Sequence, residues 1–210
     1  MAGSVSTQRR LPIGAEVQRE GGVHFRVWAP ASPTVAIEFS PEEVDDNAAL
    51  FPLEHESDGY FSGLCADARA GQRYKIRLAN GVFPDPASRF QPEGPHGPSK
   101  IVDPETFDWT DGAWRGRPAH ERIGYELHLG TFTPEGTWAA ALGQLEELAR
   151  LGLTFIEIMP LAEFPGRFGW GYDGVNLFAP SHLYGPPDDV RRFINRAHEL
   201  RLMVILDVVY

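Results

Sequence analysis

Hydrophobic and polar residues alternate along the first part of the chain and give way to longer apolar runs in the second part. The alternation has a period of two at residues 23–28, 35–39 and 73–78. This period is typical of strands with one buried face. Asn80-Gly81 favours a tight hairpin after the third run, since both central residues of such a turn adopt positive φ. We therefore predict an antiparallel β-sandwich over residues 15–88.

Prolines and glycines interrupt the pattern between residues 84 and 98. Proline lacks a backbone N–H group and fixes φ, so this stretch cannot form a central strand or a helix. Its rigid prolines and Phe90 favour a packed, ordered joint over a flexible linker. We place the joint at residues 89–120, and we expect residues 1–14 to form a flexible N-terminal tail.

Strand-like apolar runs alternate with helical patterns from residue 121 to residue 210. The strand-like runs cover residues 123–129, 153–159 and 202–209. The last two contain too few polar positions for a strand with one solvated face, so we expect both faces of these strands to be buried.

Apolar residues at helical spacing predict helices over residues 138–149 and 187–200. We expect Thr137 to cap the first helix and Gly152 to end it. The resulting β-α-β-α-β order specifies parallel strands with right-handed crossovers. A loop of about twenty residues follows the second strand, and its length suggests a functional role.

The composition is that of a soluble globular protein, with 42% hydrophobic and 23% charged residues. The net charge of -10 argues against nucleic acid or an anionic membrane as a partner, whereas a neutral sugar is compatible with it. Cys65 is the single cysteine, so no intramolecular disulfide can form. The sequence shows neither a secretory signal nor a membrane span. We therefore expect a cytoplasmic location.

Aromatic and acidic residues follow the second predicted strand, and a carboxylate ends the third. Trp170, Tyr172 and Asp173 belong to the first group, and Asp207 is the lone carboxylate. Loops at the carboxyl ends of parallel strands carry the ligand-binding groups of (β/α) barrels, so these four residues are candidates for one site. Aromatic rings suit the apolar C–H faces of a sugar. The alternatives are aromatic rings that only pack at the barrel end and a structural Asp207.

Glu126, His128 and Glu157 lie within the predicted strands. Glycoside hydrolysis requires a pair of carboxylates, but in barrels these lie at strand ends. We therefore expect Glu126 and Glu157 to form a satisfied polar cluster inside the barrel, with His128 nearer its mouth. The scattered histidines and the absence of a cysteine pair do not favour a metal site.

Several segments resemble the α-amylase superfamily. Residues 25–30 resemble the start of the sugar-binding-module-like sandwich of its debranching and branching members, and residues 170–180 and 206–210 resemble its barrel. Three further segments narrow the resemblance to the malto-oligosyltrehalose trehalohydrolase family, namely residues 84–92, 96–99 and 125–137.

The resemblance implies an immunoglobulin-like, carbohydrate-binding-module-like sandwich followed by the first three β/α units of a (β/α)8 TIM barrel, over residues 121–210. It implies a retaining hydrolase without a cofactor, which cleaves the α-1,4-glucosidic bond next to the terminal trehalose of malto-oligosyltrehalose. Tyr172 would lie under the sugar at the cleavage point and Asp207 would orient an arginine, with Trp170 and Asp173 beside them. The catalytic carboxylates would lie outside residues 1–210.

Two alternatives stay open at this point. One is a glycogen branching or debranching enzyme of the same superfamily. The other is a non-catalytic protein that binds glucan through its sandwich.

Overall fold

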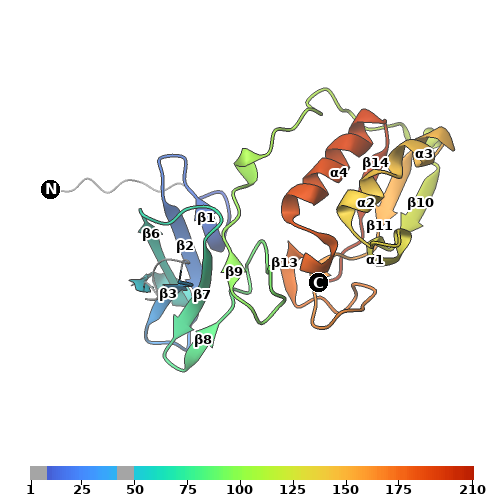
Figure 1. The fold of residues 1–210 in the computed structure, drawn as a ribbon. Helices are drawn as coiled ribbons and strands as arrows, with labels where there is room; N and C mark the ends of the chain where they lie inside the picture. Colours follow the sequence, from blue (N-terminus) through green and yellow to red (C-terminus); the bar gives the residue numbers. More distant parts are fainter. Residues whose placement is uncertain (1–8, 42–49) are drawn as a thin grey trace. The chain divides into compact units, whose positions relative to one another are not determined.

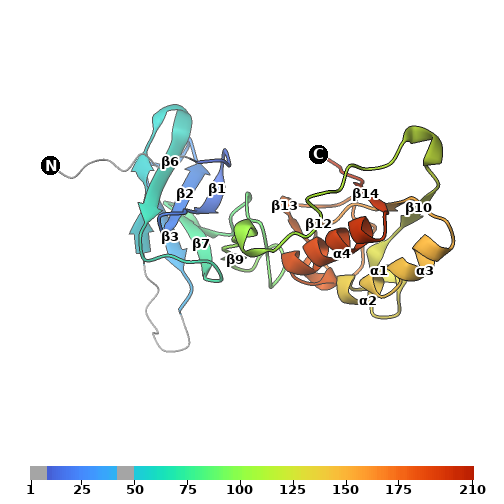
Figure 2. The ribbon, with the colours of Figure 1, turned by 90° about the horizontal axis from the view of Figure 1, so that it is seen from above.

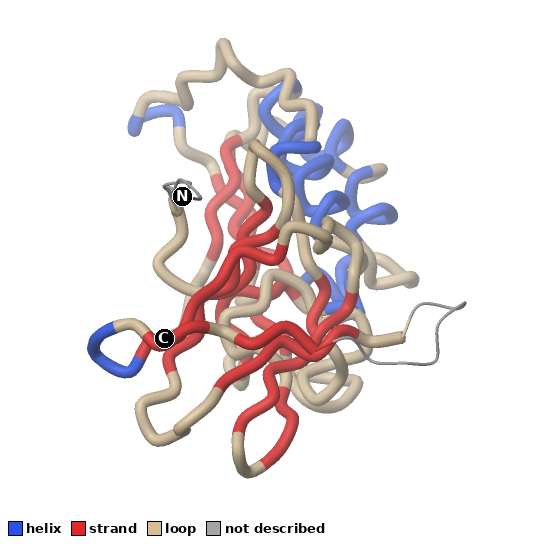
Figure 3. The backbone as a smooth tube through the Cα atoms, turned by 90° about the vertical axis from the view of Figure 1, so that its left-hand side faces the viewer, coloured by secondary structure: helices blue, strands red, loops and turns tan. Residues whose placement is uncertain are grey.

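The computed structural model describes residues 9–41 and 50–210 (Figure 3). The chain divides into two compact units, residues 1–103 and residues 104–210. Residues 1–8 of the predicted tail lie outside the described residues, whereas Arg9 donates hydrogen bonds to the carbonyl groups of His24 and Gly14. None of the helices in the described ranges is both long and apolar enough to cross a lipid bilayer.

The first unit, within its described residues, contains two antiparallel sheets (Figure 1). Its strands are β1 (Gly14–Val17), β2 (Val23–Trp28), β3 (Val35–Phe39), β4 (Leu50–Pro52), β5 (Glu54–His55), β6 (Tyr60–Cys65), β7 (Arg73–Leu78), β8 (Gly81–Phe83) and β9 (Ser99–Lys100). A 3-10 helix, η1 (Ser57–Gly59), precedes β6. One sheet has the order β1-β2-β6-β5, and the other has the order β4-β3-β7-β8, with β9 also paired to β7.

Alternate side chains of both sheets form the core of this unit. Val23, Phe25 and Val27 of β2 are buried, whereas the residues between them are partly exposed. On the opposite sheet, Ile37 and Tyr74 are buried, and the rings of Phe25 and Tyr74 meet edge to face at 5.2 Å. The predicted antiparallel sandwich is therefore present.

The hairpin after β7 differs in detail from the prediction. Ala79 and Asn80 form the turn, and Gly81 pairs with Leu78 as the first residue of β8. Neither Ala79 nor Asn80 has a positive φ, so the expected turn centred on Asn80-Gly81 was wrong. A Cβ atom at Gly81 would lie 3.0 Å from the ring of Phe83, so this strand position favours glycine.

The proline-rich residues 84–98 contain neither a helix nor a strand, yet they pack onto the first unit. Asp85 is buried and accepts a 2.6 Å hydrogen bond from the Tyr74 hydroxyl group, while its own N–H group donates to Ser99 Oγ at 3.0 Å. Burial raises the pKa of Asp85, although the hydrogen bonds that its carboxylate accepts from Tyr74 and from the N–H group of Ala87 oppose the rise. Since β8 and β9 both pair with the same edge of β7, the segment leaves this edge and returns to it.

The second unit contains a parallel sheet with helices on one side (Figure 2). The sheet strands are β10 (Gly124–Leu127), β11 (Phe155–Ile158) and β14 (Met203–Leu206), in the order β10-β11-β14. The helices are α1 (Leu129–Phe132), α2 (Trp138–Leu142), α3 (Leu145–Arg150) and α4 (Pro187–Glu199), and the short 3-10 helices are η2 (Pro104–Thr106), η3 (Ala119–Glu121) and η4 (His182–Tyr184). The predicted parallel β-α-β-α-β arrangement is confirmed.

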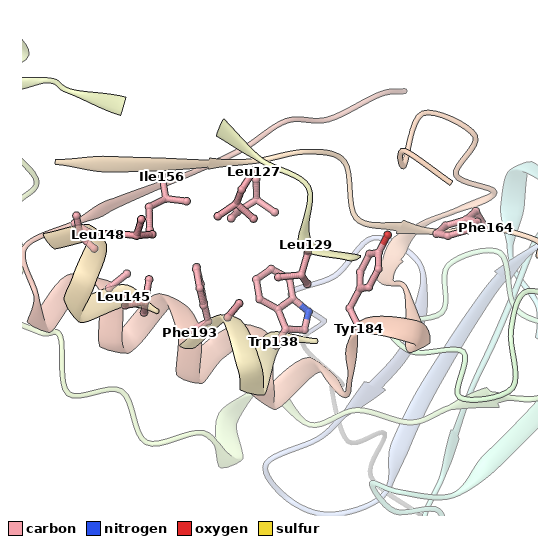
Figure 4. Close-up of a cluster of buried hydrophobic side chains, with 13 residues drawn as sticks. Leu127, Leu129, Trp138, Leu145, Leu148, Ile156, Phe164, Tyr184 and Phe193 are labelled. Carbon is pink, nitrogen blue, oxygen red and sulfur yellow. The ribbon is translucent and has the colours of Figure 1, made fainter. Parts of the chain in front are cut away.

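Side chains from the sheet and from the helices meet in one hydrophobic core (Figure 4). Leu127 and Ile156 extend from the sheet toward Trp138 and Phe193 on the helices. The rings of Trp138 and Phe193 lie edge to face with centroids 5.2 Å apart. This packing fixes which face of each strand the helices cover.

The other face of this sheet carries Glu126, Glu157 and Ile205, which are neighbours in register on β10, β11 and β14. Ile205 is 42% exposed. The third strand was expected to be buried on both faces, and that expectation was wrong because the helices of the described chain cover only one of them.

The predicted helix over residues 138–149 is two helices, α2 and α3, separated at Gly143. Glycine has a low helix propensity, and the N–H group of Gly143 bonds to the carbonyl group three residues back, at Ala140. Thr137 caps α2 as expected, since its Oγ1 accepts a hydrogen bond from the N–H group of Ala140. Gly152 has a φ of 90° and ends α3 in the predicted position.

The long segment after β11 was expected to be a loop, but it contains secondary structure. It contains a two-stranded antiparallel hairpin of β12 (Ala162–Glu163) and β13 (Asn176–Pro180). Residues 164–175 connect these two strands and carry Trp170, Tyr172 and Asp173. We call residues 164–175 the aromatic loop.

Candidate functional site

The aromatic loop contacts the residue that follows β14. The Tyr172 hydroxyl group donates a 3.0 Å hydrogen bond to Asp207 Oδ2. The N–H group of Asp207 donates to the Ile158 carbonyl group at 2.9 Å, which holds Asp207 beside the carboxyl end of β11. Two of the candidate residues therefore meet at the carboxyl edge of the parallel sheet, the edge at which such sheets bind ligands.

Glycines allow the aromatic loop to approach the end of β11 closely. Gly171 has a φ of 91°, and a Cβ atom at this position would lie 1.9 Å from the Pro160 carbonyl oxygen. At Gly169 a Cβ atom would lie 2.9 Å from the buried ring of Phe164. Close packing therefore favours glycine at both positions, and the positive φ favours it at Gly171 as well.

Hydrogen bonds to a buried carboxylate hold the base of the aromatic loop. Glu163 is fully buried, and its Oε2 accepts hydrogen bonds from the N–H group and from Nδ1 of His182, each at 2.8 Å. The carbonyl group of Glu163 accepts a 2.8 Å hydrogen bond from Val175. These bonds tie both ends of the loop to the hairpin.

His128 reaches the aromatic loop from the end of β10. Its Nε2 lies 2.9 Å from the Gly169 carbonyl oxygen and 3.3 Å from the Tyr184 hydroxyl oxygen. On the other side of the ring, Nδ1 lies 3.1 Å from Thr131 Oγ1. His128 is thus near the carboxyl edge of the sheet, as its place in the sequence predicts.

Negative charge surrounds the two tyrosines of this region. The hydrogen bond to Asp207 raises the pKa of Tyr172, and the carboxylates of Glu126 and Glu157 add to the rise. Burial raises the pKa of Tyr184, and the charge of Asp173 contributes in the same direction. Both hydroxyl groups therefore keep their protons at neutral pH and can donate hydrogen bonds. A site of this kind suits a neutral, hydroxyl-rich ligand better than an anion.

Both parts of the chain are similar to known proteins. Residues 12–104 match the family model of carbohydrate-binding module 48, described as the isoamylase N-terminal domain. A malto-oligosyltrehalose trehalohydrolase of Saccharolobus solfataricus is 45% identical over 192 residues, which are 91% of this chain and 33% of that protein. The chain resembles malto-oligosyltrehalose trehalohydrolases. It spans about a third of the length of the curated relatives that it matches.

Two further matches lie in related proteins. The crystal structure of a putative α-amylase from Salmonella typhimurium superposes with a TM-score of 0.87 at 42% identity, covering 94% of this chain and 33% of that one. A 1,4-α-glucan branching enzyme of Ralstonia nicotianae is 34% identical over 222 residues, which are 94% of this chain and 28% of that protein.

The structure brings two of the four candidate residues into contact with each other. Tyr172 and Asp207 are in contact, whereas Trp170 and Asp173 lie on the same loop with exposed side chains. Trp170 is 74% exposed in this chain. The role of these residues in binding stays a prediction.

Sequence reasoning missed Glu163, His182 and Tyr184. A signal for Glu163 was present, because an acidic residue between the apolar Leu161 and Phe164 suggests a buried carboxylate that needs donors. No pattern in the sequence pointed to His182 as that donor, since the two residues meet only through the β12–β13 hairpin.

Proposed function

We propose that this chain is the amino-terminal part of a retaining α-glucan glycoside hydrolase that releases trehalose from malto-oligosyltrehalose. The observation that carries the proposal is the match to trehalohydrolases over about nine-tenths of the chain. The contact between Tyr172 and Asp207 supports it, since it forms a polar and aromatic site at the sheet edge. An aromatic ring beside carboxylates is a chemically suitable surface for a sugar.

In this proposal β10, β11 and β14 are the first three strands of an eight-stranded barrel, with an immunoglobulin-like sandwich before them. The domain assignment is a sandwich over residues 15–88, a joint over residues 89–120 and barrel from residue 121 onward. Tyr172 lies under the sugar at the cleavage point, and Asp207 orients an arginine of the rest of the barrel. The catalytic carboxylates lie outside residues 1–210.

The test uses the full-length protein incubated with malto-oligosyltrehalose. Release of trehalose, followed by chromatography, is the expected result, and residues 1–210 alone are expected to release none. Trehalose release by the 210-residue chain would contradict the assignment of the catalytic carboxylates to positions outside residues 1–210. We further propose a cytoplasmic location, which cell fractionation would test.

A branching enzyme is the second candidate, favoured by the 34% identity to the Ralstonia nicotianae protein. The two activities differ in their products, because a branching enzyme creates α-1,6 branches in a glucan without releasing trehalose. Analysis of both products from the full-length protein therefore separates them.

A non-catalytic glucan-binding role is the third candidate, favoured by the match to a carbohydrate-binding module. In that case residues 9–104 would bind glucan and the full-length protein would change neither substrate.

A further inference from the structure

The His128 ring is held in one orientation by contacts on both of its nitrogen atoms. Nε2 lies 2.9 Å from the Gly169 carbonyl oxygen, which can only accept a hydrogen bond. Nε2 must therefore carry a proton and donate it. Nδ1, on the opposite side, lies 3.1 Å from the Thr131 hydroxyl group, which can donate to it or accept from it.

The surroundings of the ring restrict it further. Tyr184 is buried, and its ring meets the ring of His128 edge to face with centroids 6.1 Å apart. At Gly130 a Cβ atom would lie 2.9 Å from the Tyr184 ring and 3.0 Å from the His128 ring. The absence of a side chain at Gly130 thus makes room for both rings.

The acceptor of this hydrogen bond is close in sequence to the candidate sugar-binding residues. Gly169 directly precedes Trp170 and is three residues before Tyr172. Downstream, Gly171 rests against the Pro160 carbonyl group, as its missing Cβ atom requires. The backbone around Trp170 is therefore fixed at one point by His128 and at another by the end of β11.

We infer that His128 is a positioning residue, which places Trp170 and Tyr172 by donating from Nε2 to the Gly169 carbonyl group. The inference about backbone position depends only on the geometry of the second unit. Its consequence for sugar binding rests on the proposed function. Replacement of the donor frees the Gly169 carbonyl group, so the loop samples positions in which Tyr172 no longer meets Asp207.

The test compares His128→Gln with His128→Leu in the full-length protein. The glutamine amide keeps an N–H donor near the position of Nε2, whereas leucine fills similar space without a donor. Hydrogen exchange of the peptide covering residues 168–173, measured by mass spectrometry, reports how readily the loop opens. We expect exchange about tenfold faster in the leucine variant, which corresponds to one hydrogen bond, and wild-type exchange in the glutamine variant.

Kinetics with malto-oligosyltrehalose provide the second readout. We expect kcat/KM to fall roughly 10- to 100-fold in His128→Leu and to stay within about threefold of wild type in His128→Gln. Phe193→Leu is the control for stability, because Phe193 lies on α4, is buried in the core of the same unit and packs against Trp138. It should lower the Tm and leave kcat/KM within about twofold of wild type.

The outcomes separate the two claims. Wild-type exchange in His128→Leu, or equal impairment of the leucine and glutamine variants, overturns the positioning role. The expected exchange pattern in a protein that releases no trehalose supports the positioning role and refutes the proposed function instead.

Discussion

Tyr172 and Asp207 are 35 residues apart in the sequence, and a 3.0 Å hydrogen bond joins the hydroxyl group of the first to the carboxylate of the second. The bond links the aromatic loop to the end of β14. The position of the Tyr172 ring therefore depends on Asp207, because a ring that loses this hydrogen bond also moves away from the sheet edge. This dependence leads to the first prediction.

Replacement of Tyr172 separates the contribution of its ring from that of its hydroxyl group. Tyr172→Phe keeps the ring and removes the hydrogen bond, so we expect kcat/KM of the full-length protein to fall about 5- to 10-fold. Tyr172→Ala also removes the aromatic surface and should reduce kcat/KM well beyond that of Tyr172→Phe. Equal kinetics for the two variants would show that the ring does not contact the sugar.

Two glycines of the aromatic loop should respond differently to alanine. Both Gly166 and Gly171 have positive φ, but only Gly171 would place a Cβ atom against neighbouring backbone, 1.9 Å from the Pro160 oxygen. Gly166→Ala should destabilise the protein by about 1 kcal/mol through its φ angle alone. Gly171→Ala should destabilise it by at least about 3 kcal/mol, since the loop must also move.

Thermal unfolding of the full-length protein measures both variants of the aromatic loop. A Gly171→Ala variant no less stable than Gly166→Ala would contradict the close approach of the loop to β11.

Glu16 makes the stability of the first unit depend on acidic pH. Burial of Glu16 acts to raise its pKa, but hydrogen bonds from the N–H groups of Arg10 and Leu11 outweigh it and hold the pKa below its usual 4.5. The folded state therefore favours the carboxylate. Its stabilisation is present above about pH 4.5 and is lost as the pH falls through the lower pKa of the folded state.

The variant Glu16→Gln tests this pH dependence. At pH 7 it should be less stable than wild type by about 1–3 kcal/mol, and the difference should shrink as the pH falls toward 3. Denaturant unfolding at a series of pH values measures it. Glu20→Gln, at an exposed position four residues away, should match wild type throughout.

The second unit should not fold stably when residues 121–210 are expressed alone. One face of its sheet carries no helix, and Ile205 and Leu206 of β14 are 42% and 49% exposed. We expect this fragment to bind a hydrophobic dye and to unfold without a sharp transition, whereas residues 9–104 should unfold cooperatively. A sharp transition for residues 121–210 would contradict the proposal that further strands complete the sheet.

The hydrophobic periodicity predicted the strands and helices of both units, because the apolar positions of the pattern are the buried positions of these elements. Phe25 and Ile37 alternate with polar neighbours and are buried, and the apolar run around Ile156 is the central strand of the parallel sheet. Thr137 and Gly152 act as the expected helix cap and stop, since these roles depend on local backbone chemistry.

The sequence did not predict features that depend on contacts between residues far apart in the chain. The sequence does not show that Phe83 covers Gly81 or that Asp85 lies beside Tyr74. It suggested that Tyr172 and Asp207 share one edge of the sheet, because parallel strands place their carboxyl ends together. It did not reveal how the aromatic loop is held, because His128 and Glu163 act through tertiary hydrogen bonds.

Residues 84–98 depart from one edge of β7 and rejoin that edge through β9. Because both ends of the segment pair with β7, a single break within it need not displace the chain that follows it. After cleavage by a protease within this segment, the two fragments should co-elute on gel filtration.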